Sequence, residues 1–470
     1  MTKKDFDSAT ENQSPTSMYA SREKIYPRQV HGLFAFWRSI GVFTLLGLYY
    51  LIPWLLWDGH QVILFDLPDR KFYIFGLILW PQDFFLLALI LIIAGVSLFF
   101  FTAVAGRLWC GFSCPQTVWT EVFLWIERKI EGNRQQQIKL DQQELNTHKI
   151  FLKFSKHAVW IIFSLFTGFT FVGYFTPIRE LGDAISLQTL GGWETFWILF
   201  YSLATYGNAG WLREQVCIYM CPYARFQSAM FDADTLIISY DSVRGDPRGS
   251  RNKASDKTTL GLGDCIDCTL CVQVCPTGID IRDGLQYECI TCAACVDVCD
   301  SVMDKLDYDQ GLIRFTTENQ LQGKTNKQNK VRARTLIYSL VLGLLSFVLV
   351  YSVATRVPVL LDVVRDRGAI YRETWDGYIE NIYTVRILNM DAKTHQYQLT
   401  ISGMDKLELR MKNKIVTVPA GKVIEVPIWI RGDPNYLTRA RYEINFRVKS
   451  VDQPSLVATE ESRFFAPRPE

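Results

Sequence analysis

Eight of the twelve cysteines of this 470-residue chain lie in two runs with the same spacing. The first run is Cys265-x2-Cys268-x2-Cys271-x3-Cys275 and the second is Cys289-x2-Cys292-x2-Cys295-x3-Cys299. Three thiolates that are three residues apart on a curled loop can reach three irons of one cubane cluster. The fourth cysteine, one residue further on, is turned away and can reach a second cluster. The spacing therefore predicts two [4Fe–4S] clusters.

The same spacing occurs in bacterial-type two-cluster ferredoxins, where the fourth cysteine of each run ligates the other cluster. We therefore expect two crossed ligand sets. They are Cys265, Cys268, Cys271 and Cys299 for one cluster, and Cys289, Cys292, Cys295 and Cys275 for the other. Structural zinc needs only paired C-x2-C knuckles and would leave half of these cysteines unexplained. The runs predict a protein that transfers single electrons.

The four remaining cysteines form a second repeated motif, C-x3-C-P, with the pairs Cys110/Cys114 and Cys217/Cys221. Residues i and i+4 share one face of a helical turn, and the following proline favours a helix start or break. Three interpretations are open, namely buried structural cysteines, a further iron–sulfur site, and a soft-metal or dithiol redox site. We favour the third, with all four cysteines as copper ligands and as the place of reduction, because thiolates select Cu(I).

Other redox cofactors have little support in the sequence. Only one of the five histidines, His157, lies beside a predicted membrane span, whereas a bis-histidine haem needs two. No phosphate-binding loop and no convincing G-x-G-x-x-G after a strand is present. We therefore expect a separate cytoplasmic electron donor, whose identity the sequence does not reveal, and no nucleic-acid partner.

Long uncharged stretches divide the first three quarters of the chain, which is 49% hydrophobic overall. Each is close to the roughly 20 residues that a helix needs to cross a bilayer. They are Ser39–Trp57, Phe84–Gly106, Ala158–Ile178, Thr195–Leu212 and Thr335–Thr355. These stretches predict five spans, of which the fourth is short and contains two glycines. The shorter stretch Lys71–Trp80 is expected at the membrane interface.

The distribution of basic residues predicts the orientation of these spans. The N-terminal arm and the segment after the second span are rich in lysine and arginine, whereas the candidate outer loops are poor in them. No cleavable signal peptide is recognisable. All twelve cysteines then face the cytoplasm or its membrane edge, where thiols stay reduced. We expect a multi-pass protein of the bacterial inner membrane, with its N-terminus and clusters cytoplasmic and its C-terminal part periplasmic.

The residues after the last span change character. Tyr397, Leu399 and Ile401 alternate with polar residues, as do Tyr442, Ile444, Phe446 and Val448, and Val423–Ile430 is a third strand-like run. This pattern is typical of a small β-sandwich. The expected fold is therefore a multi-domain α-helical membrane protein with an inserted two-cluster ferredoxin domain and a C-terminal sandwich.

Five segments follow from these patterns. They are a polar arm (1–33), a four-span membrane domain with both C-x3-C-P motifs (34–222), a ferredoxin-type domain and linker (223–333), a fifth span (334–356) and the sandwich (357–470).

Three segments carry a resemblance to a known family. The segments 107–115 (RLWCGFSCP), 214–228 (EQVCIYMCPYARFQS) and 240–248 (YDSVRGDPR) resemble the CcoG/FixG/RdxA family of cytochrome c oxidase accessory proteins. The resemblance implies an immunoglobulin-like sandwich and reduction of Cu(II) to Cu(I) for delivery to cbb3-type oxidases. It also implies a copper-exporting ATPase or copper chaperone and oxidase assembly factors as partners. Asp300 departs from the ferredoxin pattern, in which a proline follows the last cysteine.

Two other functions remain open at this stage. One is a transmembrane or quinol-linked electron conduit without a metal substrate, and the other is a non-catalytic scaffold for oxidase assembly. A conduit would need redox groups on the periplasmic side, and the sequence shows none.

Overall fold

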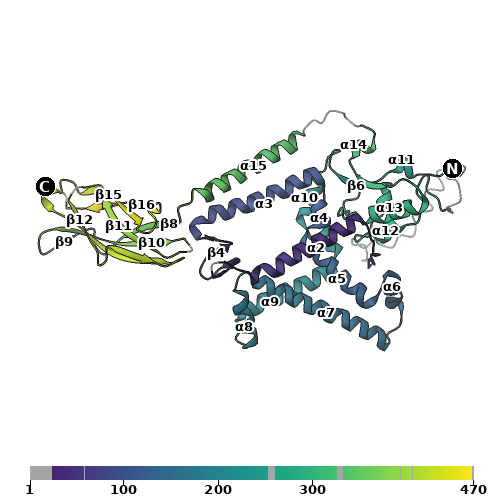
Figure 1. Cartoon of the computed structure of the whole chain (residues 1–470), viewed down its shortest axis with the longest axis horizontal. Coiled ribbons are helices and arrows are strands. Elements are labelled where there is room, and N and C mark those ends of the chain that lie inside the picture. The colour runs from purple at the N-terminus through teal and green to yellow at the C-terminus, as the bar shows by residue number, and fades with distance from the viewer. Residues whose placement is uncertain are drawn as a thin grey trace, which may run out of the picture. The chain divides into compact units, whose positions relative to one another are not determined.

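The computed structural model of the chain describes residues 24–57, 59–251, 260–324, 332–391, 393–404 and 406–467 (Figure 1). Most of the predicted N-terminal arm and the linker residues 325–331 lie outside these ranges. The chain forms two compact units. The first comprises residues 1–43, 102–162 and 206–328, and the second comprises residues 44–101, 163–205 and 329–470.

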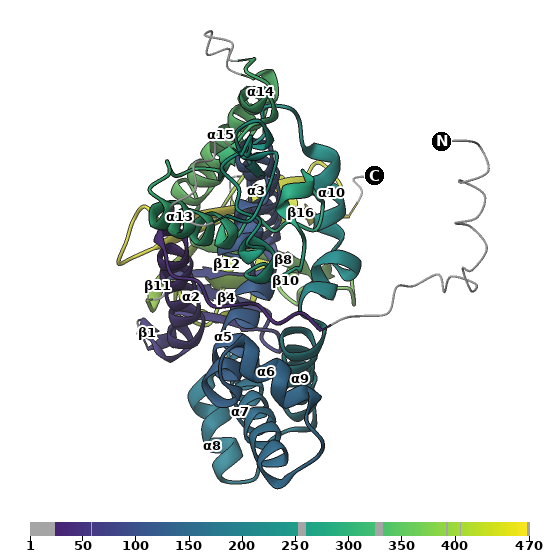
Figure 2. The ribbon, with the colours of Figure 1, turned by 90° about the vertical axis from the view of Figure 1, so that its right-hand side faces the viewer.

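The first unit contains short helices on either side of each C-x3-C-P motif. Its helical elements are the start of α2 (Leu33–Leu51), α4 (Leu108–Phe112), α5 (Pro115–Glu131), α6 (Arg134–Gln142), the first part of α7 (Thr147–Val172), the π-helical η3 (Tyr206–Leu212) and η4 (Val216–Met220), and α10 (Pro222–Met230). Helices α5, α6 and α7 lie side by side in both views (Figures 1 and 2). The glutamine-rich segment after α5 forms α6.

Buried ion pairs fasten α5 to α7 and η3. Glu127 lies 2.8 Å from Arg213 and 3.4 Å from Lys156, and Glu131 lies 2.9 Å from both Lys153 and Lys156. Both carboxylate side chains are at most 1% exposed. Removing one partner of such a buried pair typically costs about 3–5 kcal/mol, because the other charge is left without compensation. These pairs therefore fix the segment after η3, which carries the second C-x3-C-P motif, onto α5.

The ferredoxin-type part of the first unit is built on one strand pair and several short helices. Its elements are β6 (Ile237–Tyr240), α11 (Ser242–Gly245), α12 (Leu270–Gln273), η5 (Ile281–Asp283), α13 (Ala294–Leu306), β7 (Ile313–Thr316) and α14 (Glu318–Leu321). Strands β6 and β7 pair antiparallel. Ile238, Met303, Leu312 and Ile313 form the buried core beneath the cysteine loops.

Both cysteine loops have the same unusual backbone. The residues before and after the second cysteine of each run have positive φ angles, 53° at Asp267 and 54° at Thr269, 58° at Thr291 and 59° at Ala293. Non-glycine residues adopt this left-handed conformation at a cost in free energy, and such residues cluster at ligand-holding sites. The curled loop that the spacing predicts is thus formed twice.

The second unit contains the greater part of the apolar helices. It holds the end of α2, most of α3 (Phe84–Ala105), the end of α7, α8 (Ile178–Ser186), α9 (Gly192–Thr205) and α15 (Ala333–Ala354). Among the described helices, four are long and apolar enough to cross a membrane, at Leu33–Trp54, Pro81–Ala105, Thr147–Val172 and Ala333–Ala354. The predicted fourth span falls on the 14-residue α9 and the 7-residue η3 that follows it directly. Its crossing of the membrane stays a prediction.

Short strands connect the first two apolar helices. These are β1 (Leu56–Trp57), β2 (His60–Gln61), β3 (Ile63–Asp66), β4 (Lys71–Ile74) and β5 (Leu77–Leu79), followed by the turn η2 (Pro81–Asp83); the turn η1 (Ile52–Trp54) precedes them. Strands β3, β4 and β5 form one antiparallel sheet. The stretch Lys71–Trp80, too short to cross a membrane, is therefore part of this sheet.

The C-terminal part of the second unit is the predicted β-sandwich, whose strands are the yellow-green arrows of Figure 1. One sheet has the order β12-β14-β10-β8 with β9 on β10, and the other has the order β13-β11-β15-β16. The strands are β8 (Val359–Arg365), β9 (Arg372–Glu373), β10 (Ile379–Asn389), β11 (His395–Ser402), β12 (Leu407–Arg410), β13 (Ile415–Val418), β14 (Val423–Gly432), β15 (Arg441–Ser450) and β16 (Val457–Phe465).

The apolar residues that alternate with polar ones in the sequence form the core of this sandwich. Tyr397, Ile444, Phe446 and Val448 are fully buried, and their neighbours along the strands face outward. The prediction of a C-terminal sandwich is confirmed.

Candidate functional site

The two cysteine runs surround two separate cavities in the first unit. One cavity, of about 380 Å³, is lined by Cys265, Cys268, Cys271 and Cys299. The other, of about 340 Å³, is lined by Cys275, Cys289, Cys292 and Cys295, and Cys271 also borders it. The fourth cysteine of each run thus lies at the cavity of the other run. This is the crossed grouping that the spacing predicts, and iron ligation by these residues stays a prediction.

The arrangement of the thiols fits a cluster of several atoms. Nowhere in the described ranges do three or more His, Cys, Asp or Glu side chains gather around the position of one metal ion. Thiols that hold the corners of a cubane stand further apart than the ligands of one ion, so they enclose a cavity and do not converge on a point. The two cavities, each lined by the four cysteines of one crossed set, match the predicted pair of cubane sites.

Burial makes the free thiolates of these cavities unfavourable. Desolvation raises the pKa of Cys271 to about 11 and the pKa values of Cys289 and Cys299 to about 12. The positive charge of Arg282 partly offsets this effect at Cys271. A bound metal group supplies the positive charge that stabilises such buried thiolates, and its binding displaces their protons.

The first membrane helix is attached to the second cavity through its N-terminus. The carboxylate of Asp297, on α13, accepts hydrogen bonds from the backbone N–H groups of Phe34 and Ala35 at 3.1 and 2.7 Å. A carboxylate at this position satisfies free N–H groups and interacts favourably with the helix dipole. Arg38, one turn further along α2, donates to the carbonyl of Cys292 at 3.3 Å. Helix α2 therefore begins directly on the cysteine loop.

The C-x3-C-P cysteines lie where one helix ends and the next begins. Cys110 is in α4, and Cys114 is the N-cap of α5 with Pro115 at the first helical position. In the second motif Cys217 is in η4, and Cys221 is the N-cap of α10. The proline starts a helix, as predicted. The backbone is extended at the second cysteine of each motif, with ψ of 131° and 110°, so the helix that carries the first cysteine does not continue through the second. A shared face for the two thiols of each pair stays a prediction.

The four cysteines nevertheless come near one another. Burial raises the pKa of Cys110 to about 11, and the neighbouring thiols of Cys114 and Cys221 add to this increase. Burial raises the pKa of Cys217 to about 12, with further contributions from Cys114, Cys110 and Cys221. Thiols from two motifs that are about a hundred residues apart therefore interact electrostatically. We refer to these four residues, Cys110, Cys114, Cys217 and Cys221, as the cysteine group, and their joint binding of a metal ion stays a prediction.

This cysteine group lies against the second cavity. A Cβ atom at Gly111 would be 2.7 Å from the carbonyl oxygens of Ile290 and Thr291, which lie between two cysteines of the second run. Cys110 itself packs against the apolar cluster that contains Ile290 and Cys292. Only glycine allows α4 to approach the cysteine loop this closely.

Arg107 strengthens this junction from the start of α4. It donates to the carbonyl of Ala224, on α10, at 2.7 Å and also to the carbonyl of Tyr287, just before the second cysteine run. One buried side chain thus connects the cysteine group to the loop of the second cavity.

Sequence reasoning missed four residues that build this site, namely Arg38, Arg107, Gly111 and Asp297. A signal existed for Arg38, since an ionisable residue beside an apolar span indicates a specific role. The other three depend on tertiary packing. Asp300, the departure from the ferredoxin pattern, accepts a hydrogen bond from the N–H group of Gly311 at 2.8 Å and lies outside the expected ligand sets.

His157, the one histidine considered as a haem ligand, has protein partners. Its Nδ1 lies 3.0 Å from the hydroxyl of Tyr206, and its ring stacks on Trp211 at 5.7 Å between centroids. His157 is therefore hydrogen-bonded and packed within the first unit.

Comparisons with protein families match most of the chain. A model described as a 4Fe-4S dicluster domain matches residues 212–318, and one described as a 4Fe-4S binding domain matches residues 85–133. A third, described as the IG-like fold at the C-terminal of FixG, matches residues 349–467.

Three relatives cover nearly the whole chain. Protein RdxB of Cereibacter sphaeroides is 39% identical over 88% of this chain and 90% of its own length, and protein RdxA of the same organism is 40% identical over 82% and 84%. The nitrogen fixation protein FixG of Rhizobium meliloti is 35% identical over 92% and 94%. The crystal structure of a FixG-related protein from Vibrio parahaemolyticus covers 23% of this chain and 95% of that chain, at 26% identity and a TM-score of 0.21. The chain belongs to the family of FixG, RdxA and RdxB and is an iron–sulfur redox protein of a membrane.

Proposed function

We propose that this protein reduces Cu(II) to Cu(I) at the cysteine group formed by Cys110, Cys114, Cys217 and Cys221. The Cu(I) would serve copper delivery during the assembly of cbb3-type cytochrome c oxidase. The observation that carries the proposal is the contact of Gly111 with the backbone of Ile290 and Thr291, since it sets the cysteine group directly beside the second cluster cavity.

The residues that would hold the clusters are the two crossed sets. Cys265, Cys268, Cys271 and Cys299 would hold one [4Fe–4S] cluster, and Cys289, Cys292, Cys295 and Cys275 would hold the other. When bound, such clusters accept and release one electron at a time. The buried, largely apolar walls of both cavities limit the access of water to them.

The cysteine group suits the product of the reaction better than the substrate. Cu(II) prefers nitrogen and oxygen ligands in a square-planar arrangement, whereas Cu(I) is stabilised by two or three soft thiolates. Thiols held close together therefore favour the one-electron reduction of Cu(II) and retain the Cu(I) that forms. No thiol is consumed, because the electron comes from the iron–sulfur part of the protein.

The remaining parts of the proposal concern location and partners. Basic residues around the second and third spans support a cytoplasmic cysteine group, and five spans would place the sandwich in the periplasm of a bacterial inner membrane. A copper-exporting ATPase or copper chaperone would receive Cu(I), and oxidase assembly factors would contact the protein. A cytoplasmic donor is one possible source of electrons.

A second function is favoured by one specific finding. The 4Fe-4S binding family model matches residues 85–133, which contain Cys110 and Cys114 but neither cysteine run. This match supports a further iron–sulfur site at the C-x3-C-P motifs. The protein would then be an electron conduit without a metal substrate.

Cu(II) reduction by the purified protein, after its clusters have been reduced with dithionite and excess reductant has been removed, separates these functions. We expect Cys110→Ser/Cys114→Ser to abolish Cu(II) reduction while the iron content and both cluster spectra stay unchanged. Ser113→Ala is the matched control, because it alters the same turn and keeps both thiols. A loss of iron in the double variant would instead support a third cluster. Full activity in the double variant would refute copper reduction at this group.

A further inference from the structure

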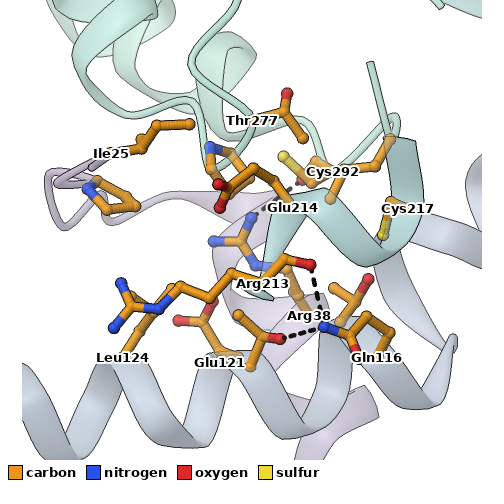
Figure 3. Close-up of a pocket in the computed structure, with 15 residues that line it drawn as sticks. Ile25, Arg38, Gln116, Glu121, Leu124, Arg213, Glu214, Cys217, Thr277 and Cys292 are labelled. Atoms are coloured by element: carbon orange, nitrogen blue, oxygen red, sulfur yellow. Dashed lines mark hydrogen bonds between the residues drawn. The ribbon is translucent and has the colours of Figure 1, made fainter. Parts of the chain in front are cut away.

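A third cavity lies between the cysteine group and the second cysteine run, within the first unit (Figure 3). Its walls come from the N-terminal arm, α2, α5, the segment after η3 and the loops that carry Pro276 and Cys292.

Two cysteines border this cavity. Cys217 belongs to the cysteine group, and Cys292 belongs to the second cluster set. Figure 3 shows Cys292 close to the Arg38 side chain, with Cys217 on the neighbouring helical segment. A molecule bound here would therefore touch both proposed electron-transfer sites.

The charges of the cavity wall balance. Its ionisable lining residues other than cysteine are two arginines and two glutamates, Arg38, Arg213, Glu121 and Glu214. Glu121 is paired with Arg128 at 2.9 Å, and Arg213 is paired with Glu127 at 2.8 Å. Because the net charge of these four groups is zero, they do not favour a strongly charged ligand over an uncharged one. The wall suits an uncharged ligand with both apolar and polar parts.

The remaining lining residues support such a ligand. Ile25, Pro27, Leu124 and Ile290 provide apolar surface for a ring, and the side chains of Gln116 and Thr120 provide polar contacts. Glu214 is a carboxylate with only 7% exposure and can accept a hydrogen bond or a proton from a ligand hydroxyl.

The cavity also lies near one end of a candidate membrane span. Arg38 is five residues from Leu33, where the span begins, which corresponds to roughly 7.5 Å along the helix axis. A lipid-soluble molecule could therefore reach the cavity from the edge of the bilayer.

We propose that this cavity binds the head group of a membrane quinol, which is the electron donor for the proposed Cu(II) reduction. This inference rests on that proposed function. One quinol and two Cu(II) ions give one quinone, two Cu(I) ions and two protons. The quinol loses its two hydroxyl protons to water with Glu214 as the accepting carboxylate, and its two electrons leave singly to the two copper ions. A separate cytoplasmic donor is then unnecessary.

The test uses the full-length protein with its clusters, in detergent and without oxygen. Binding of decylubiquinone is measured by equilibrium gel filtration, and the oxidation of dithionite-reduced clusters by the same quinone is followed by absorbance. We expect saturable binding of about one quinone per chain and an oxidation rate that saturates with quinone concentration.

Substitutions that fill the cavity provide the specific test. Thr120→Phe should weaken quinone binding at least tenfold and remove the saturation of the oxidation rate. Thr147→Phe, the same substitution at an exposed position outside the cavity, should leave both unchanged. Iron content and cluster spectra report whether the Thr120→Phe variant folds. If it does not fold, Ile25→Trp is used in its place, because it fills the same cavity from the N-terminal arm.

Three outcomes decide the inference. Saturable binding that the filling substitutions remove supports it. Binding that does not saturate, or that is equal in wild type and filled variants, overturns it. Quinone binding with the expected pattern in a protein whose reduced clusters, freed of dithionite, fail to reduce Cu(II) would instead reject the proposed copper function and leave the quinol cavity in place.

Discussion

The two cysteine systems of this protein are built in different ways. In the two runs, a local backbone pattern with left-handed residues beside the second cysteine curls each loop around a cavity. In the C-x3-C-P motifs, each cysteine pair lies at a junction between two helices, and the pairs meet through the packing of distant segments. Short-range spacing therefore predicts the first site almost completely, whereas the second site depends on tertiary contacts.

The largest expected effect tests the crossed grouping in the runs. Cys265→Ser and Cys299→Ser should each remove the same cluster, because both residues line one cavity. The double variant should therefore lose no more iron than either single variant, about half of the total. Iron analysis and low-temperature electron paramagnetic resonance measure this. Additive losses in the double variant would show that the two cysteines belong to different clusters.

A smaller effect is expected where the two systems meet. Gly111→Ala would place a Cβ atom 2.7 Å from two carbonyl oxygens of the second cysteine loop and should destabilise the protein by about 1–3 kcal/mol. It should also slow the transfer of electrons to copper, because α4 must move away from the loop. Thermal unfolding and single-turnover Cu(II) reduction measure the two effects.

The control for this prediction is Gly182→Ala in α8, where an added Cβ would have open space. That substitution should be neutral or stabilising by up to about 1 kcal/mol, because alanine is the better helix former. Equal effects of the two substitutions would remove the argument for a required close approach at Gly111.

Substitution of Asp297 tests how firmly the second cysteine run is attached to helix α2. Asp297→Ala removes the acceptor for two N–H groups at the start of α2 and should cost about 0.5–2 kcal/mol. Hydrogen exchange of the Phe34 and Ala35 amides should become faster, while Asp297→Asn should retain part of the protection. Unchanged exchange in the alanine variant would contradict this capping role.

The smallest expected effect concerns the N-terminal arm beside the cysteine group. Burial would raise the pKa of Asp141, but hydrogen bonds from Lys153, Lys24 and Tyr26 lower it overall from the usual 3.8. Because the pKa is lower in the folded state, the stabilisation is complete well above pH 3.8 and is lost as the pH falls through the folded-state value.

Limited proteolysis of the arm measures this stabilisation. Cleavage near Lys24 should increase as the pH decreases below 3.8 in the wild type, while Asp141→Asn should be cleaved readily at all pH values. Identical pH profiles for the two proteins would show that this carboxylate does not hold the arm.

The contrast between the two systems also explains what the sequence could predict. The cluster loops, the sandwich and the proline helix starts follow from spacing and alternation, which act over a few residues. The roles of Asp297 and Gly111 depend on contacts with residues that are 262 and about 180 positions away, and no local pattern indicates them. The fourth predicted span shows a different limit of sequence-based prediction. Its apolar composition is clear from the sequence, but the change of its helix to a π-helical form at Tyr206 is not.

The central claim is that electrons held by the runs reach copper through the C-x3-C-P thiols, and a single-turnover experiment tests it most directly. The protein is reduced with dithionite, freed of excess reductant and mixed with Cu(II) under anaerobic conditions, and Cu(I) is counted per chain. With two clusters that each give one electron, the wild type should yield about two Cu(I), and Cys217→Ser/Cys221→Ser should yield almost none while its clusters stay reduced. Two Cu(I) per chain from the double variant would contradict the claim.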